Sequence, residues 1–132
     1  MKLCLNSRLV SLFTGAVIAI LGQKATAVTV QSYVNPNPVP VNFRTYQYEE
    51  VTLEGANSYW TNSTFYFNYV GHYGFYQDKN TPVGEETTGG SDVAIVIPSH
   101  TGYWDAYTIA RGHDSSNIPF YASSNHVTVY VC

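Results

Sequence analysis

The sequence has 132 residues, of which 45% are hydrophobic and 11% charged, and its formal net charge is −3. This length suits one domain with its own core. Beyond residue 27, three basic residues stand against nine acidic ones, a balance of −6. Such a surface is a poor counterion for phosphates or anionic lipid, so we expect no nucleic-acid partner.

The N-terminus has the pattern of a secretory signal peptide. Lys2 and Arg8 form a basic start, Leu9–Gly22 is apolar, and Ala25-Thr26-Ala27 has the small-x-small pattern of a cleavage site. The alternative is a membrane anchor, but the apolar run falls short of the roughly 20 residues that a span needs. We expect residues 1–27 to be removed, which leaves a secreted, extracellular chain, 28–132, with no membrane span.

The first half of this mature chain predicts strands by alternation. Val28–Val34 is a first strand, and the proline-rich Asn35–Pro40 is a crossing where an edge strand changes sheets. Tyr46–Leu53 is the next strand. After a predicted loop over Glu54–Asn62, Ser63–Val70 is the best candidate for a central strand, with Phe65, Phe67 and Tyr69 on one face.

The second half continues the pattern. A short strand is expected at Phe75–Gln77, and another near Val83. Asp92–Arg111 holds two strand-like runs joined by a polar turn, and we expect the sides shared by Val93, Ile95 and Ile97, and by Tyr107 and Ile109, to be buried. Phe120–Asn125 is expected to be irregular, and Val127, Val129 and Val131 share one face of a last strand.

About seven short strands without a helical segment predict an antiparallel seven-stranded β-sandwich, immunoglobulin-like or fibronectin-III-like. The Cys…Trp…Cys spacing of antibody domains is missing. Tyr107 is a candidate tyrosine corner, with ordinary core packing as the alternative.

Aromatic residues concentrate in the predicted turns, and these are the candidate binding residues. Tyr59, Trp60, Phe120 and Tyr121 are expected at one pole of the sandwich, and Tyr73, Tyr103 and Trp104 at the other. Flat side chains with a polar tip suit contacts with sugars or proteins. The alternative is that they seal the ends of a small core.

The sequence offers little for metal binding or catalysis. His72, His100, His113 and His126 lack the spacing of a zinc site, and no calcium loop is present. Ser99 and His100 are adjacent with Asp105 nearby, but no nucleophile elbow or carboxylate pair accompanies them. We therefore expect no metal, no cofactor and no enzymatic activity.

Two further positions are candidates for covalent modification. Asn62-Ser63-Thr64 matches the N-glycosylation pattern at a predicted loop–strand border. Cys4 leaves with the signal, so Cys132 becomes an odd thiol that could pair between chains and form a dimer. The alternative is that Cys132 is an incidental residue at the chain end.

The pattern VTLEG…TFYFNYV…GFYQ…TPVG…GSDVAIVIPS…YTIAR…HVTVYV, over Val28–Val131, resembles the immunoglobulin-like N-terminal domain of secreted, Ser/Thr-rich fungal cell-surface proteins. That family includes proteins of yeast β-1,6-glucan assembly. The resemblance implies a non-catalytic module of the cell wall or matrix, with wall polysaccharide or a surface protein as partner. Two alternatives are a secreted effector or inhibitor of a foreign protein, and a self-assembling surface subunit joined through the Val127–Val131 edge.

Overall fold

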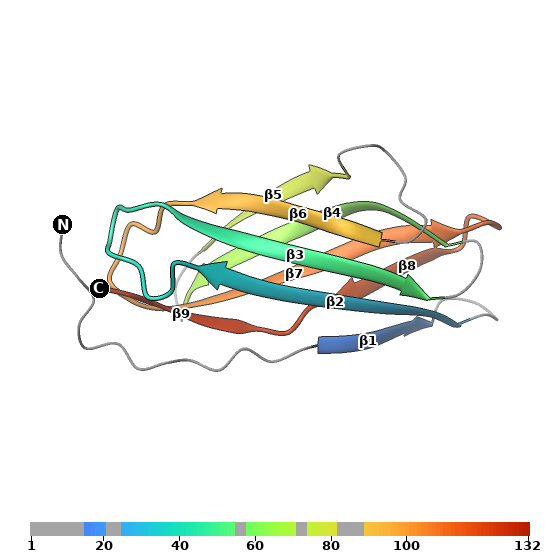
Figure 1. Ribbon diagram of the computed structural model, residues 1–132, viewed down its shortest axis with the longest axis horizontal. Coiled ribbons are helices and arrows are strands. Elements are labelled where there is room, and N and C mark those ends of the chain that lie inside the picture. Colours follow the sequence, from blue (N-terminus) through green and yellow to red (C-terminus); the bar gives the residue numbers. More distant parts are fainter. Residues whose placement is uncertain (1–14, 21–24, 55–57, 71–73, 82–88) are drawn as a thin grey trace.

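The computed structural model describes residues 15–20, 25–54, 58–70, 74–81 and 89–132, and this part of the chain is all β (Figure 1). Its strands all pair antiparallel and no helix is present among these residues. The strands are β1 (Gly15–Ile20), β2 (Ala25–Asn35), β3 (Thr45–Glu54), β4 (Ser58–Tyr69), β5 (Gly74–Asn80), β6 (Gly89–Val96), β7 (Gly102–Asp114), β8 (Pro119–Ser123) and β9 (Val127–Val131).

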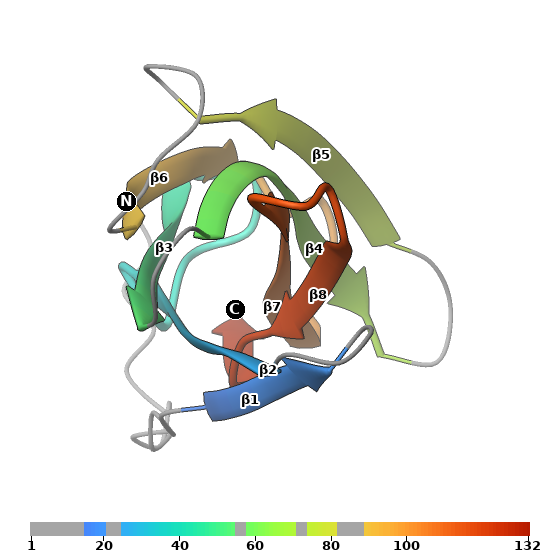
Figure 2. The same cartoon turned by 90° about the vertical axis from the view of Figure 1, so that its right-hand side faces the viewer.

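The strands form two sheets that face each other (Figure 2). The first sheet, in front in Figure 1, has the order β1-β2-β3-β6. The second has the order β5-β4-β7-β8, and β9 pairs with the part of β7 that β8 leaves free. β4 is therefore a central strand, as predicted, because it pairs with both β5 and β7.

About seven strands were expected over residues 28–132, and this count is too low: the described residues hold nine strands, eight of which, β2 to β9, belong to that part of the chain. One addition is β1, which lies inside the predicted signal peptide and pairs with β2. Another is β8, where an irregular segment was expected. β4 also begins at Ser58, inside the predicted loop, and the strand expected near Val83 lies outside the described residues. No helix of the described chain is long and apolar enough to cross a membrane.

The proline-rich segment after β2 contacts the second sheet, as its sequence predicted. Val39 forms a parallel bridge with Val131 of β9. Just before it, the Asn37 side chain imitates a strand: its Nδ2 donates to the Thr128 carbonyl, and its Oδ1 accepts from the Tyr130 N–H. The edge of β9 is therefore covered, and the expectation of a bare Val127–Val131 edge is wrong.

The side chains of β6 and β7 face the opposite way from the prediction. Ala94 and Val96 are buried, whereas Ile95 and Ile97 are 55% and 52% exposed. On β7 the buried residues are Trp104, Ala106, Thr108, Ala110 and Gly112, so Tyr107 and Ile109 lie on the outer face. Tyr107 is therefore neither a core residue nor near a corner of the sandwich.

Small residues line the inside because large aromatic rings fill the space between the sheets. Trp60 and Phe120 pack against Ala110 and Ala122 in one core cluster. Both rings lie beside Gly112, the cross-strand partner of each. A Cβ at Gly112 would come within 2.5 Å of the Phe120 ring, so this position requires glycine.

Two apolar clusters fill the two ends of the interior, and a polar layer separates them. The first cluster includes Val30 and Val51, and the second includes Val34 and Trp104. Between them, on β2, β3, β4, β7 and the segment that joins β8 to β9, lie buried polar residues, namely Ser32, Gln47, Glu49, Ser63, Thr108, Ser124 and Asn125. The sequence analysis did not identify this polar layer.

Candidate functional site

The polar layer is the first candidate, because it contains a buried acid. Burial raises the pKa of Glu49 to about 7. The nearby hydroxyls of Ser63 and Thr108 oppose this shift, and Asp92 adds to it. Neither carboxylate oxygen has a hydrogen-bond partner in the structure.

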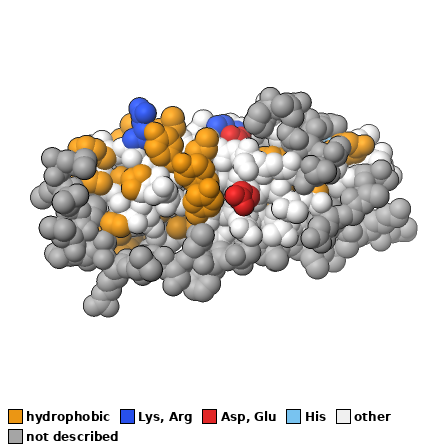
Figure 3. Space-filling view, in the orientation of Figure 1, with side chains coloured by type: hydrophobic (Ala, Val, Ile, Leu, Met, Phe, Trp, Pro, Cys, Tyr) orange, Lys and Arg blue, Asp and Glu red, His pale blue; other side chains and the backbone are white. Residues whose placement is uncertain are grey.

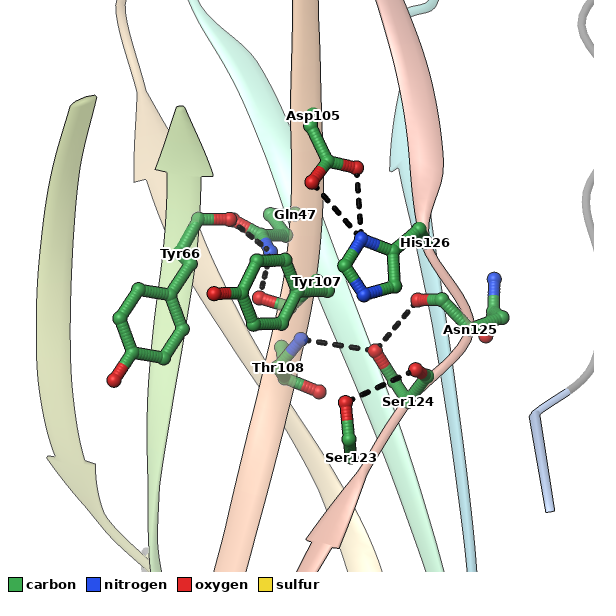
Figure 4. Close-up of polar contacts among 9 residues, drawn as sticks. All are labelled: Gln47, Tyr66, Asp105, Tyr107, Thr108, Ser123, Ser124, Asn125 and His126. Atoms are coloured by element: carbon green, nitrogen blue, oxygen red, sulfur yellow. Dashed lines mark hydrogen bonds and ion pairs between the residues drawn. The ribbon is translucent and has the colours of Figure 1, made fainter. Parts of the chain in front are cut away.

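The rest of the polar layer is occupied with joining strands (Figure 4). Gln47 Nε2 on β3 donates to the Tyr66 and Tyr107 carbonyls of the opposite sheet. Asn125 bonds both the N–H and the carbonyl of Ser32, and Ser124 Oγ accepts from the Thr108 N–H. The Gln47 and Asn125 contacts join the two sheets, and the Ser124 contact joins β7 to the segment between β8 and β9, so we assign the layer a structural role.

A ladder of rings crosses the outer face of the second sheet. Tyr66 stacks on Tyr107 at 4.8 Å, and Tyr107 stacks on His126 at 4.3 Å. His126 Nδ1 lies 2.9 Å from both carboxylate oxygens of Asp105 (Figure 4). Burial raises the pKa of the Tyr107 hydroxyl, and Tyr66 and Asp105 raise it further. Because the rings face one another, the ladder offers solvent few free ring faces.

The same outer face carries an open pocket of about 330 Å³, lined by Asn62, Asp78, Asn80 and Arg111. The Thr64 hydroxyl accepts from Arg111 Nη1 at 2.6 Å and donates to Asp78 Oδ1 at 2.5 Å. The Thr64 hydroxyl thus bonds both a cation, Arg111, and an acid, Asp78, that line the same pocket. We call these five residues the Arg111 pocket.

Strand register explains how the Arg111 pocket forms. Asn62 on β4 pairs with Asn80 on β5 and with Arg111 on β7, and Arg111 pairs with Tyr121 on β8. The four side chains therefore follow one line across four strands. The Arg111 guanidinium lies 6.0 Å from the centre of the Tyr121 ring, a cation–π distance.

The predicted binding residues gather around β7, but they divide between the core and the surface. Trp60 and Phe120 are only 1% and 3% exposed, so they are core residues and offer no surface for a ligand. Tyr59 is partly buried and lies 5.1 Å from His113. Tyr121 is 55% exposed and stands beside the Arg111 pocket.

The second predicted pole divides in the same way. Trp104 is buried, its Nε1 donates to the His100 carbonyl, and Tyr103 is exposed beside Tyr130. Tyr73 lies outside the described residues.

The two modification candidates also have definite places. Asn62 lies in a central strand rather than at an accessible loop–strand border, and its Oδ1 is buried. Glycosylation there stays a prediction. Cys132 is disulfide-bonded in the structure, and its partner lies outside the described residues. Pairing between chains therefore depends on the loss of Cys4 with the signal peptide.

The histidines do not converge on one place. His113 Nδ1 contacts the Asp114 carbonyl, and His126 contacts Asp105. Ser99 Oγ lies 2.8 Å from His100 Nδ1, a close contact for chain neighbours. Asp105, however, pairs with His126 and not with His100. No group of three potential metal ligands occurs in the part of the chain that the structure describes, and His72 lies outside it.

Comparisons with known proteins support the fold alone. No family model matches the chain, and no curated protein matches it. Among solved structures, the chain is similar to a Bordetella pertussis protein that carries the name ApaA, with a TM-score of 0.55 and 12% sequence identity. The match covers 80% of this chain and 93% of that one.

Proposed function

We propose that this protein is an exported, non-catalytic β-sandwich of the immunoglobulin or fibronectin-III kind that binds glycan at a cell wall or in the surrounding matrix. The strand arrangement supports this fold assignment. In chain order, β2, β3 and β6 match strands A, B and E of such domains, and β4, β7 and β9 match C, F and G. The resemblance to fungal wall proteins and the signal-like N-terminus support the location.

The observation that carries the proposal is the Arg111 pocket beside the exposed Tyr121. A guanidinium, a carboxylate and two amides offer fixed donors and acceptors, and the neighbouring ring offers an apolar surface. Sites of this composition suit polyhydroxylated ligands, which need both kinds of contact. Binding thus moves from loop aromatics to a sheet face, and of the four aromatic candidates Tyr121 stays in the site.

Retention on insoluble wall polysaccharide tests the proposal. We expect Arg111→Ala and Tyr121→Ala each to weaken retention about tenfold, the effect of losing one charge-assisted hydrogen bond or one aromatic contact. Tyr103→Ala is the matched control, because Tyr103 is equally exposed at the other end of β7. Unchanged retention of both pocket variants, with unchanged thermal unfolding, would reject the proposal.

Comparing Trp60→Ala with Tyr121→Ala tests whether Trp60 is a core residue and Tyr121 a surface residue. Removing this buried side chain should cost about 3–5 kcal/mol of unfolding free energy, because a large cavity remains. Tyr121→Ala should cost well under that, since the ring is half exposed. Chemical denaturation of both variants measures the difference, and equal losses would contradict the placement of these two residues.

A second candidate function is binding of a foreign protein, as an effector or inhibitor would. A hydrophobic band crosses the outer face of the first sheet (Figure 3). It holds the stacked Tyr33 and Tyr48 together with Ile95, which pairs with the neighbouring Tyr46. If a protein is the ligand, Ile95→Lys should abolish its capture while Arg111→Ala has no effect.

A further inference from the structure

We propose that the Arg111 pocket takes one neutral sugar residue and holds two adjacent hydroxyl groups between Arg111 and Asp78. This inference rests on the proposed glycan binding and narrows it to a ligand class. Four observations carry it, namely the charge balance of the pocket, its hydrogen-bonding groups, its size and the ring beside it.

The charges of the pocket cancel. Arg111 and Asp78 are joined only through the Thr64 hydroxyl, and among the described residues neither has an ion-pair partner. The other cation of this region, Lys79, is paired with Asp92 at 3.2 Å. A sugar carboxylate in the pocket would lie close to Asp78, and a sugar ammonium would lie close to Arg111. A neutral ligand meets neither repulsion.

The free hydrogen-bonding groups are of both kinds. The Thr64 hydroxyl is already used, because it accepts from Arg111 and donates to Asp78. Further N–H groups of Arg111 can only donate, whereas the Asp78 carboxylate can only accept.

A complementary ligand must therefore donate and accept from neighbouring atoms. A hydroxyl group does both. Phosphate or carboxylate would satisfy Arg111 but would leave Asp78 without a donor. Two adjacent hydroxyls, one facing Arg111 and one facing Asp78, satisfy both residues.

Size and shape set the length of the bound unit. About 330 Å³ lies at the small end of ligand sites, which suits one ring and not a folded oligosaccharide. The pocket opens onto a sheet face, so neighbouring sugar units of a chain can continue across the surface. The half-exposed Tyr121 ring beside Arg111 provides the apolar contact for a sugar ring.

Titration calorimetry of the full chain tests the inference with neutral hexasaccharides of glucose, mannose and N-acetylglucosamine, and with oligogalacturonate as the acidic probe. Asp78→Asn keeps the shape of the side chain and removes its charge. We expect at least one neutral probe to bind, oligogalacturonate not to bind, and Asp78→Asn to weaken the neutral probe about tenfold. Glu50→Gln, an equal charge change exposed on the opposite sheet, should change nothing.

The possible failures are distinguishable. If oligogalacturonate binds better than the neutral probes and Asp78→Asn strengthens it, the neutral-sugar inference is wrong but glycan binding stands. If a neutral probe binds and Asp78→Asn has no effect, the sugar lies elsewhere and the pocket assignment is wrong. If no probe binds to protein shown to be folded by circular dichroism, and wall polysaccharide does not retain it either, both the inference and the proposed function fail.

Discussion

At the scale of single residues, adjacent positions on one strand have opposite environments. Glu49 and Glu50 follow each other on β3, so their side chains point to opposite faces of the sheet. Glu50 is exposed, whereas Glu49 is fully buried and its pKa is raised to about 7. Burial is the largest cause of the raised pKa of Glu49, and the nearby Asp92 adds to it.

Glu49 makes the stability of the fold dependent on pH. Its pKa rises from 4.5, the value for an unperturbed side chain, to about 7 on folding, so the folded state binds this proton more tightly. The contribution to stability is therefore complete below pH 4.5 and is lost as the pH rises to about 7. We expect a loss of roughly 3 kcal/mol over this range, measured by urea unfolding at successive pH values.

Glu49→Gln tests whether Glu49 causes this pH dependence, because the glutamine side chain is neutral at every pH. We expect this variant to lose most of the decline between pH 4.5 and 7 and to be more stable than the parent protein at pH 8. Glu50→Gln is the control and should retain the decline. An equal decline in Glu49→Gln and in the parent protein would show that another group is responsible.

At the scale of elements, side chains protect the edges of both sheets. Asn37 covers the edge of β9 by donating to Thr128 and accepting from Tyr130. On β6, Lys79 Nζ donates to the Val93 carbonyl, and Asp92 Oδ1 accepts from the Val93 N–H. Unpaired backbone groups at an edge invite pairing with another chain, and these contacts occupy some of them.

Asn37→Ala should expose the β9 edge. We expect a loss of about 1–3 kcal/mol, because two backbone groups lose their partners, and increased self-association. Denaturation measures the first effect, and sedimentation at rising protein concentration measures the second. Thr52→Ala, at an exposed position of β3, is the control. A variant that is as stable and as monomeric as the parent protein would refute the role of Asn37.

At the scale of the whole molecule, the predicted export signal, β1 and the Cys132 disulfide are connected. Cleavage after Ala27 would remove β1 and half of the β2 residues with which it pairs. The core would retain Val28 and Val30, which are buried in the first apolar cluster. Cleavage would also remove Cys4, the other cysteine of the sequence, and would so leave Cys132 as a thiol in the cleaved form.

We expect the 28–132 form to fold on its own and to carry one reactive thiol. The second sheet and both apolar clusters lie entirely within it. Circular dichroism checks the fold, and alkylation followed by intact mass measurement counts the thiol. A dimer on non-reducing gels that Cys132→Ser abolishes would establish pairing between chains. Failure of this form to fold would show that β1 belongs to the mature domain.

The sequence by itself determined the class of the fold and most of its strands. Alternation correctly predicted β2, β3, β4 and β9, because in each the larger apolar residues occupy one face. The inward-facing valines of β9 were correct for the same reason. No pattern marked β8, whose five residues follow a polar, turn-rich stretch.

Only the tertiary structure decided which faces are buried and where the candidate site lies. On β6 both faces carry apolar residues, and the smaller ones face the opposite sheet because its tryptophan and phenylalanine rings need the space. The Arg111 pocket takes residues from three strands, and its polar side chains have no recognisable spacing along the chain. They meet because strand register places them on one line, and register depends on how entire strands pair.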